Sequence, residues 1–370
     1  MRPNLFSAFL LLVVSCGVGL ARKPEQDTGC CGFVARPSSA TSYESTSQGT
    51  DGESEGGHLS ELNHQVWLRL TAHQLISAHG YFARVTGETA PGEANAELFD
   101  REGKLISQAH IWFPEALRVF LFDVSPLSDG GAVASGQAET TEGSTSFLAK
   151  TDTSGSSTSV LRLQTFIPGR VCQASDDTIW VFGRDAEKES ASDLTYRLVR
   201  QYSFEKGLLR SYLPRESIAL RKHAMVGGGG PNGSFLVCGE NQISLYLNQT
   251  NEYIQINTDT QTLQRWKMDM APLAQAKVTG FAVTENGRVY ASLYELQPAS
   301  ERKTHGLFEL RAEPEKEIAT WVAVTGTLNS HREGEAVAKG TFWRLWGTEG
   351  NDLIIGQQYD AEFSWVRVIH

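Results

Sequence analysis

From Trp67 onwards the chain alternates short apolar segments with short polar turns, and helical periodicity is nearly absent. One landmark recurs, a turn rich in Asp, Asn and Gly that is followed by a β-branched or aromatic strand. It occurs as SDGGAVASG from Ser128, SDDTIWVFG from Ser175, PNGSFLVCG from Pro231, ENGRVYAS from Glu285 and TEGNDLIIG from Thr348. The steps between successive landmarks are 47, 56, 54 and 63 residues. An all-strand repeat of this length is typical of the blades of a β-propeller.

The intervals between landmarks also contain the remaining strands of a blade. After the second landmark come TYRLVRQYSF from Thr195, a turn at Lys206-Gly207 and LLRSYLP from Leu208. A strand YFARVTG from Tyr81 and a hairpin FDREGKLI from Phe99 indicate one further unit before the first landmark. The sequence therefore predicts an all-β fold, a six-bladed β-propeller of four-stranded antiparallel blades.

Two strand assignments in this propeller are less direct. The HAMVGGGG segment from His223 is expected to be the inner strand of the fourth blade. The sixth unit, whose last strand is FSWVRVIH from Phe363, lacks an outermost strand. The segment HQVWLRL at 64–70 alternates as a strand should, so we expect it to close the ring beside this unit and to place Trp67 near Trp365. The same segment could instead be the inner strand of the first blade.

The N-terminal residues have the pattern of an export signal. Arg2 is followed by an apolar run over 5–14, which is shorter than the ~20 residues of a membrane-spanning helix. Val-Val-Ser-Cys at 13–16 resembles a bacterial lipobox, in which Cys16 would carry the lipid that anchors the protein to a membrane. Ordinary cleavage after Ala21 is the other interpretation.

The segment after the signal is polar. From Ser38 it reads SSATSYESTSQGTDGESEGG, which contains too few apolar residues to offset the entropy of ordering. The sequence thus predicts a signal peptide at 1–21, a disordered polar linker at 22–61 and the propeller at 62–370.

Residues from about 62 to 370 resemble exported bacterial six-bladed β-propellers of the broad superfamily that includes TolB-like, lactonase-like and NHL-like members. The repeated turn-and-strand landmark carries this resemblance. Lactonase-like members hold a divalent metal in the channel through acidic and amide side chains from separate blades. The resemblance makes Asp123, Asp176, Glu240 and Asn286 candidate ligands, for example of calcium, although three of the four also read as ordinary turn residues.

Other chemistry is sparse in the sequence. It contains no HExxH, HxH or HxxxH pair. Its one GxSxG match, GESEG at 52–56, lies in the polar linker and not between a strand and a helix, so it does not indicate a nucleophile elbow. Trp343 and Trp346 in TFWRLWG fall on the expected inner strand of the sixth blade, where they would either stack on a ligand such as a sugar ring or wedge adjacent blades together. Cys172 and Cys238 lie in apolar surroundings and are interpreted first as buried thiols, with a disulfide between them as the alternative.

The net charge and the composition reduce the number of function classes that fit this sequence. A net charge of −10 argues against a protein that grips nucleic acid, which normally presents a basic face. The sequence favours an exported, lipid-anchored propeller at the periplasm or cell surface, monomeric and without a cofactor. Its expected role is that of a binding or scaffold module for a protein or carbohydrate. The alternative is a metal-dependent hydrolase or lactonase that uses the central channel.

Overall fold

The computed structural model describes residues 58–69, 76–86, 93–100, 104–220, 233–271, 273, 276–296, 302–326, 342–359 and 362–369. They all belong to one compact unit, Glu53–His370. The expected lipidation at Cys16, the signal peptide and most of the linker lie outside the described residues. Among the described residues, no helix has the length and apolar character needed to cross a bilayer.

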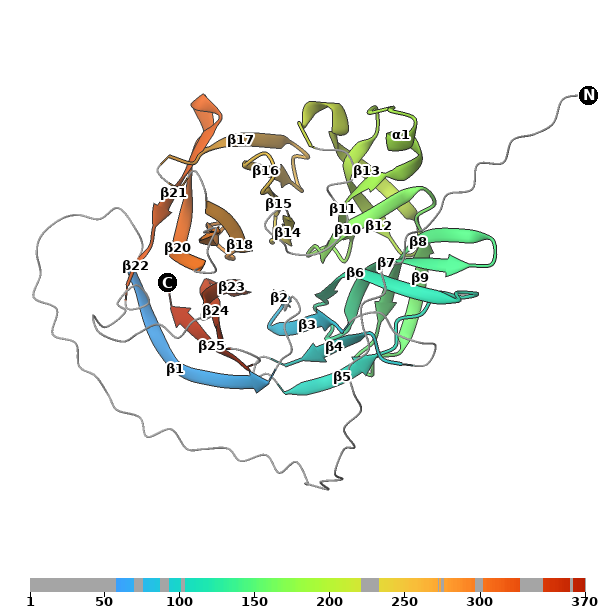
Figure 1. Cartoon of the computed structure of the whole chain (residues 1–370), viewed down its shortest axis with the longest axis horizontal. Helices are drawn as coiled ribbons and strands as arrows, with labels where there is room; N and C mark the ends of the chain where they lie inside the picture. Colours follow the sequence, from blue (N-terminus) through green and yellow to red (C-terminus); the bar gives the residue numbers. More distant parts are fainter. Residues whose placement is uncertain are drawn as a thin grey trace, which may run out of the picture. The chain divides into compact units, whose positions relative to one another are not determined.

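The regular structure is almost entirely β-strand (Figure 1). In the described part of the chain the helical segments are the five-residue α1 (Ala186–Ser190) and the two short 3-10 turns η1 (Arg215–Ser217) and η2 (Pro314–Lys316). The Asp185 side chain accepts a hydrogen bond from the Lys188 N–H and so caps the N-terminus of α1. The predicted all-β class is therefore confirmed.

The strands form antiparallel groups of four that follow chain order. The first two groups are β2 (Ile76–Ala78), β3 (Tyr81–Val85), β4 (Ala96–Phe99) and β5 (Leu105–Ala109), then β6 (Arg118–Pro126), β7 (Ala132–Thr140), β8 (Gly143–Thr151) and β9 (Ser157–Arg162). The third is β10 (Phe166–Gln173), β11 (Ile179–Asp185), β12 (Arg197–Ser203) and β13 (Gly207–Pro214).

The fourth and fifth groups share one sheet. They are β14 (Ser234–Cys238), β15 (Gln242–Leu247), β16 (Glu252–Asn257) and β17 (Leu263–Asp269), then β18 (Ala276–Val283), β19 (Val289–Leu296), β20 (Arg302–Glu313) and β21 (Ile318–Ala323). The outer strands β17 and β21 pair in parallel over three residues, which makes a single eight-stranded sheet. This differs from the expectation of separate four-stranded blades. The extra pairing satisfies backbone groups that two open strand edges would otherwise leave exposed.

The sixth group includes the N-terminal strand. It consists of β23 (Phe342–Glu349), β24 (Asp352–Tyr359), β25 (Glu362–Ile369) and β1 (His58–Arg69), with the two-residue β22 (Thr325–Gly326) at its edge. β1 runs antiparallel to β25, with Val66 opposite Trp365 and Trp67 opposite Ser364. This backbone pairing agrees with the expected closing strand, while β2 is the first strand of the first group.

The first strands of the six groups contact one another in a closed order. β2 contacts β6, β6 contacts β10, β10 contacts β14, β14 contacts β18, β18 contacts β23, and β23 contacts β2. Five apolar clusters fill the spaces between consecutive groups, from the first to the sixth. For example, the ring of Tyr246 on β15 stacks against that of Phe281 on β18, with 5.8 Å between the ring centroids. The core therefore lies between neighbouring sheets.

The third landmark, PNGSFLVCG, is out of phase with the other four. SDGGAVASG, SDDTIWVFG, ENGRVYAS and TEGNDLIIG each lead into the second strand of a group, whereas PNGSFLVCG contains β14, a first strand. The equivalent turn of the fourth group is at 239–241. The described first strand of the fourth group is β14, and the HAMVGGGG segment expected in that place lies outside the described residues. A Pro-Asn-Gly turn signal marks a strand start but does not say which strand follows.

Candidate functional site

A cavity of about 90 Å³ opens where the six first strands meet. Every first strand contributes to its wall, as do residues of the adjoining turns. One lining residue from each group, in chain order, is Ala78, Asp123, Arg170, Val237, Phe281 and Trp346. A concave site lined by apolar groups and a few convergent polar ones is the default place to look for binding.

Four of the first strands are irregular at the level of this cavity. The pairing register of β6 shifts between Leu121 and Asp123, and that of β10 shifts between Pro168 and Arg170. β18 and β23 have the same kind of shift, ahead of Gly280 and Gly347 respectively. A β-bulge turns the side chains that follow it. The bulges therefore decide which residues of these four strands reach the cavity.

The bulges also explain a glycine in the sequence landmarks. A Cβ atom on Gly136 of β7 would lie 2.5 Å from the carbonyl oxygen of Phe120, and one on Gly183 of β11 would lie 2.4 Å from that of Ile167. Both carbonyls belong to the first strand of the same group, just before its register shift. Only glycine permits so close a backbone approach. The last letter of SDGGAVASG and SDDTIWVFG is thus required by the shape of the neighbouring first strand.

A buried ion pair links three neighbouring first strands. The Arg170 guanidinium on β10 is 3.0 Å from a carboxylate oxygen of Asp123 on β6, and the two side chains are 8% and 3% exposed. The other Asp123 oxygen accepts a hydrogen bond from the Val171 N–H, and Arg170 Nε donates to the Ser234 carbonyl on β14. Breaking such a pair by removing one partner typically costs about 3–5 kcal/mol. Both charges therefore serve to hold adjacent groups together.

The surroundings shift the pKa of groups at the cavity. Burial raises the pKa of Asp123, while Arg170 and the Val171 N–H act in the opposite direction. His79, in the turn after β2, has its pKa lowered by desolvation, against a hydrogen bond with the Gln173 backbone and the charges of Asp129 and Asp177. The lowered pKa favours the neutral imidazole at the mouth of the cavity.

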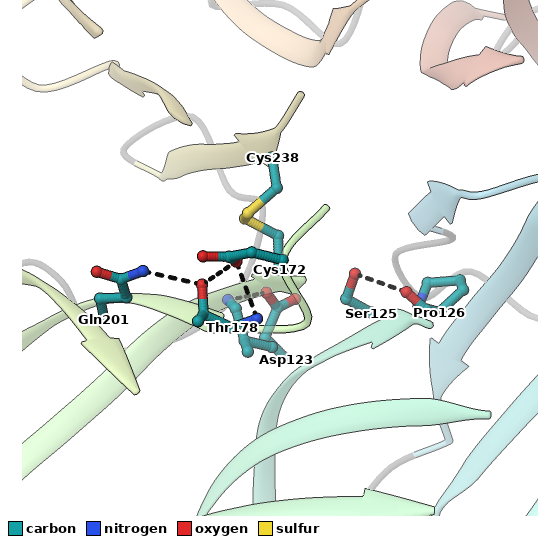
Figure 2. Close-up of a disulfide and its surroundings, with 9 residues drawn as sticks. Asp123, Ser125, Pro126, Cys172, Thr178, Gln201 and Cys238 are labelled. Atoms are coloured by element: carbon teal, nitrogen blue, oxygen red, sulfur yellow. Dashed lines mark hydrogen bonds between the residues drawn. A yellow bond between two sulfur atoms is a disulfide. The ribbon is translucent and has the colours of Figure 1, made fainter. Parts of the chain in front are cut away.

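A disulfide forms part of the cavity wall. Cys172 on β10 and Cys238 on β14 are bonded, with 5.7 Å between their Cα atoms (Figure 2). The first interpretation, two buried free thiols, is therefore wrong, and the alternative is correct. Sequence could not settle the matter because the two cysteines are 66 residues apart and only the contact of the two first strands brings them together.

Turns around the mouth of the cavity are bonded to one another. Gln173 accepts a hydrogen bond from the Ser128 N–H and donates one to Asp177. Ser175 donates to the carbonyl of Glu240 in the next group. The Asn286 N–H likewise donates to the Asn351 side chain in the sixth group. These bonds join the rim of the cavity from the second group to the fourth, and from the fifth group to the sixth.

The four candidate metal ligands do not share one place in the described structure. Asp123 is buried in its ion pair, whereas Asp176 is exposed and accepts hydrogen bonds from Thr178 in its own turn. Glu240 is exposed on the rim, and the Asn286 side chain accepts a hydrogen bond from Thr284. Among the described residues, no three His, Cys, Asp or Glu side chains are grouped so that they could hold a metal ion.

The two candidate stacking residues both lie on β23. Trp346 is 7% exposed, lines the cavity and meets Phe82 edge to face, with 6.4 Å between the ring centroids. It therefore packs the sixth group against the first. The side chain of Trp343 lies outside the described residues. Sequence reasoning missed Arg170 and His79. Arg170 was detectable as the one charge in the otherwise uncharged strand FIPGRVCQ.

Comparison with known proteins gives distant structural likenesses only. No protein-family model matches the chain, and no curated protein matches its sequence. A member of the DUF4221 family from Bacteroides vulgatus ATCC 8482 is similar over 85% of this chain and 99% of its own, with 11% identity and a TM-score of 0.49.

Two further solved structures have TM-scores of 0.40. A protein of unknown function from Bacteroides caccae is similar over 68% of this chain and 86% of its own at 13% identity. The PQQ-bound aldose sugar dehydrogenase from Streptomyces coelicolor is similar over 85% of this chain and 98% of its own at 10% identity. Likenesses this distant carry no information on activity or ligand.

Proposed function

We propose that this chain is an exported six-bladed β-propeller that is anchored to a membrane by a lipid on Cys16. It acts as a binding or scaffold module for a protein or carbohydrate partner at the bacterial envelope. The closed order of contacts among the six first strands supports the blade count. The four-stranded antiparallel groups, with β1 completing the sixth, support the same architecture.

Export is supported by two independent features. The N-terminal residues have a charged start, an apolar run and a lipobox-like Val-Val-Ser-Cys. The disulfide between Cys172 and Cys238 fits an oxidising compartment, because cytosolic thiols are normally kept reduced. A lipid on Cys16 would keep such a protein at a membrane surface.

The binding role is supported by one observation: polar groups in the cavity wall are hydrogen-bonded to other parts of the protein. The carboxylate of Asp123 accepts bonds from Arg170 and from the Val171 N–H, and the Gln173 amide joins the turns of two groups. A general base needs a proton-accepting atom, and a general acid a proton-donating one, that can reach a substrate. The Asp123, Arg170 and Gln173 side chains instead fix the shape of a concave surface, which is what a binding module requires.

A metal test separates binding from hydrolysis. We expect millimolar calcium, compared with EDTA, to leave the melting temperature of the full mature chain unchanged, and lactone and ester substrates not to turn over. A resident metal at 100 times its Kd would instead add about 2.7 kcal/mol to the free energy of unfolding. Melting measured by differential scanning calorimetry, with the matched salt magnesium as control, checks this. Stabilisation by calcium together with turnover would contradict the binding role and show that the protein is a metal-dependent hydrolase.

A further inference from the structure

The turns of the propeller gather at two ends, and the mouth of the cavity lies at one of them. In an antiparallel group of four, the turn between strands one and two lies at the same end as the turn between strands three and four. The cavity is lined by the last residues of several first strands, including Ala78, Gln173 and Cys238. We call this end the turn face, and it comprises residues 79–80, 127–131, 152–156, 174–178, 204–206, 239–241, 258–262, 284–288, 314–317 and 350–351.

The turn face is strongly acidic. Exposed carboxylates on the turns nearest the cavity are those of Asp129, Asp176, Asp177, Glu240 and Glu285. The turns farther out add Glu205, Asp259, Glu315 and Glu317, all exposed. The described turn face itself carries three cations, Lys206, Arg288 and Lys316. Arg288 is 2.7 Å from Glu309, Lys316 is paired with Glu313, and Lys150 on β8 is 2.9 Å from Asp129. At the opposite end the exposed Arg118 and the partly exposed Lys188 lie among the carboxylates. Arg184 and Arg215 at that end are paired with the buried Glu189.

The cavity supplies a second, independent indication of a ligand. Ser125 on β6 lines it and is 2% exposed. Its hydroxyl donates a long hydrogen bond of 3.5 Å to the Pro126 carbonyl (Figure 2). A hydroxyl that donates one hydrogen bond keeps lone pairs on its oxygen that can accept another, here from a cationic donor in the cavity. At about 90 Å³ the cavity is smaller than the roughly 300–1,000 Å³ of small-molecule sites, which favours the end of one side chain over a whole sugar ring.

We propose that the turn face docks a basic segment of a protein partner, with one lysine or arginine side chain directed into the mouth of the cavity. This rests on the proposed binding function and names the chemistry of the partner. The exposed carboxylates attract the segment, and the Ser125 hydroxyl and the aromatic wall at Phe281 and Trp346 receive the inserted side chain. Because rim charges act mainly by steering association, the affinity falls as salt is raised.

Two charge-matched variants of the full mature chain test the inference with a fluorescein-labelled oligolysine peptide as the probe. The turn-face variant carries Asp129→Asn, Asp176→Asn, Asp177→Asn, Glu240→Gln and Glu285→Gln. The control variant, changed at exposed positions toward the opposite end, carries Glu115→Gln, Glu139→Gln, Glu142→Gln, Glu187→Gln and Glu216→Gln. Both variants lose the same number of charges, so their net charges are equal. The Asn replacements keep the oxygen that accepts the turn hydrogen bonds at Asp129 and Asp176.

We expect the turn-face variant to bind oligolysine about tenfold more weakly than the wild type, and the control variant to stay within about twofold, as measured by fluorescence anisotropy. A Ser125→Ala variant should weaken binding at unchanged melting temperature. Equal losses in the two charge variants would show a response to net charge alone and overturn the inference. Unchanged affinity in the turn-face variant would overturn it as well. Neither result depends on the calcium test, so the two proposals fail separately.

Discussion

Deleting residues 22–69 is expected to unfold or aggregate the protein, whereas deleting residues 22–57 leaves its melting temperature nearly unchanged. The longer deletion removes β1, which pairs with β25 at seven positions and also with β22. Each lost hydrogen bond removes a net stabilisation of about 0.5–1.5 kcal/mol. Summed over the strand, this loss is a large part of the ~5–15 kcal/mol that stabilises a domain. The exposed edge of β25 would then be open to pairing with other chains.

Thermal melting followed by light scattering distinguishes the two deletions. The shorter one is the matched control, because it removes N-terminal residues and keeps every described strand. If both deletions melt alike, β1 does not hold the sixth group closed, and the folded region begins nearer Tyr81.

Replacing both Cys172 and Cys238 with alanine is expected to lower the free energy of unfolding by about 4 kcal/mol. The bond closes a loop between residues 66 apart, and the chain-entropy estimate for that length gives this value. It also ties β10 to β14 at the wall of the cavity. Urea unfolding with and without a reductant measures the loss.

The double variant provides its own control for this measurement. Its stability should not respond to reductant, and the reduced wild type should fall to the level of the variant. Free thiols at Cys172 and Cys238 in the unreduced, folded protein, detected by alkylation and mass spectrometry, would contradict the expectation.

Local sequence was a good guide to the strands of this fold. Alternating apolar positions bounded by Gly and Asp turns predicted β3, β12, β13 and β24 close to their observed positions, because a strand with one buried face leaves a period of two. The fourth group was misassigned because its turn at 239–241, Gly-Glu-Asn, is less marked than the Pro-Asn-Gly that precedes β14. The pairing of β17 with β21 leaves no local signal, since it depends on where two outer edges meet.

The site was harder to predict than the strands. Asp123 was singled out as a metal ligand, but its partner Arg170 is 47 residues away and reaches it only because β6 contacts β10. The bulges that aim these side chains are set by pairing between strands and not by residue type. The same limit applies to the disulfide. Local pattern specifies which residues face inward, while the closed order of contacts specifies which of them meet.

Site-specific photo-crosslinking in living cells tests most directly whether partners bind at the turn face. A benzophenone side chain placed at Glu240, exposed on the rim of the cavity, is expected to yield a discrete adduct. The same side chain at Glu142, exposed in the turn between β7 and β8 at the opposite end, is expected to yield none. An adduct at Glu142 and none at Glu240 would place partner binding away from the turn face and contradict the account.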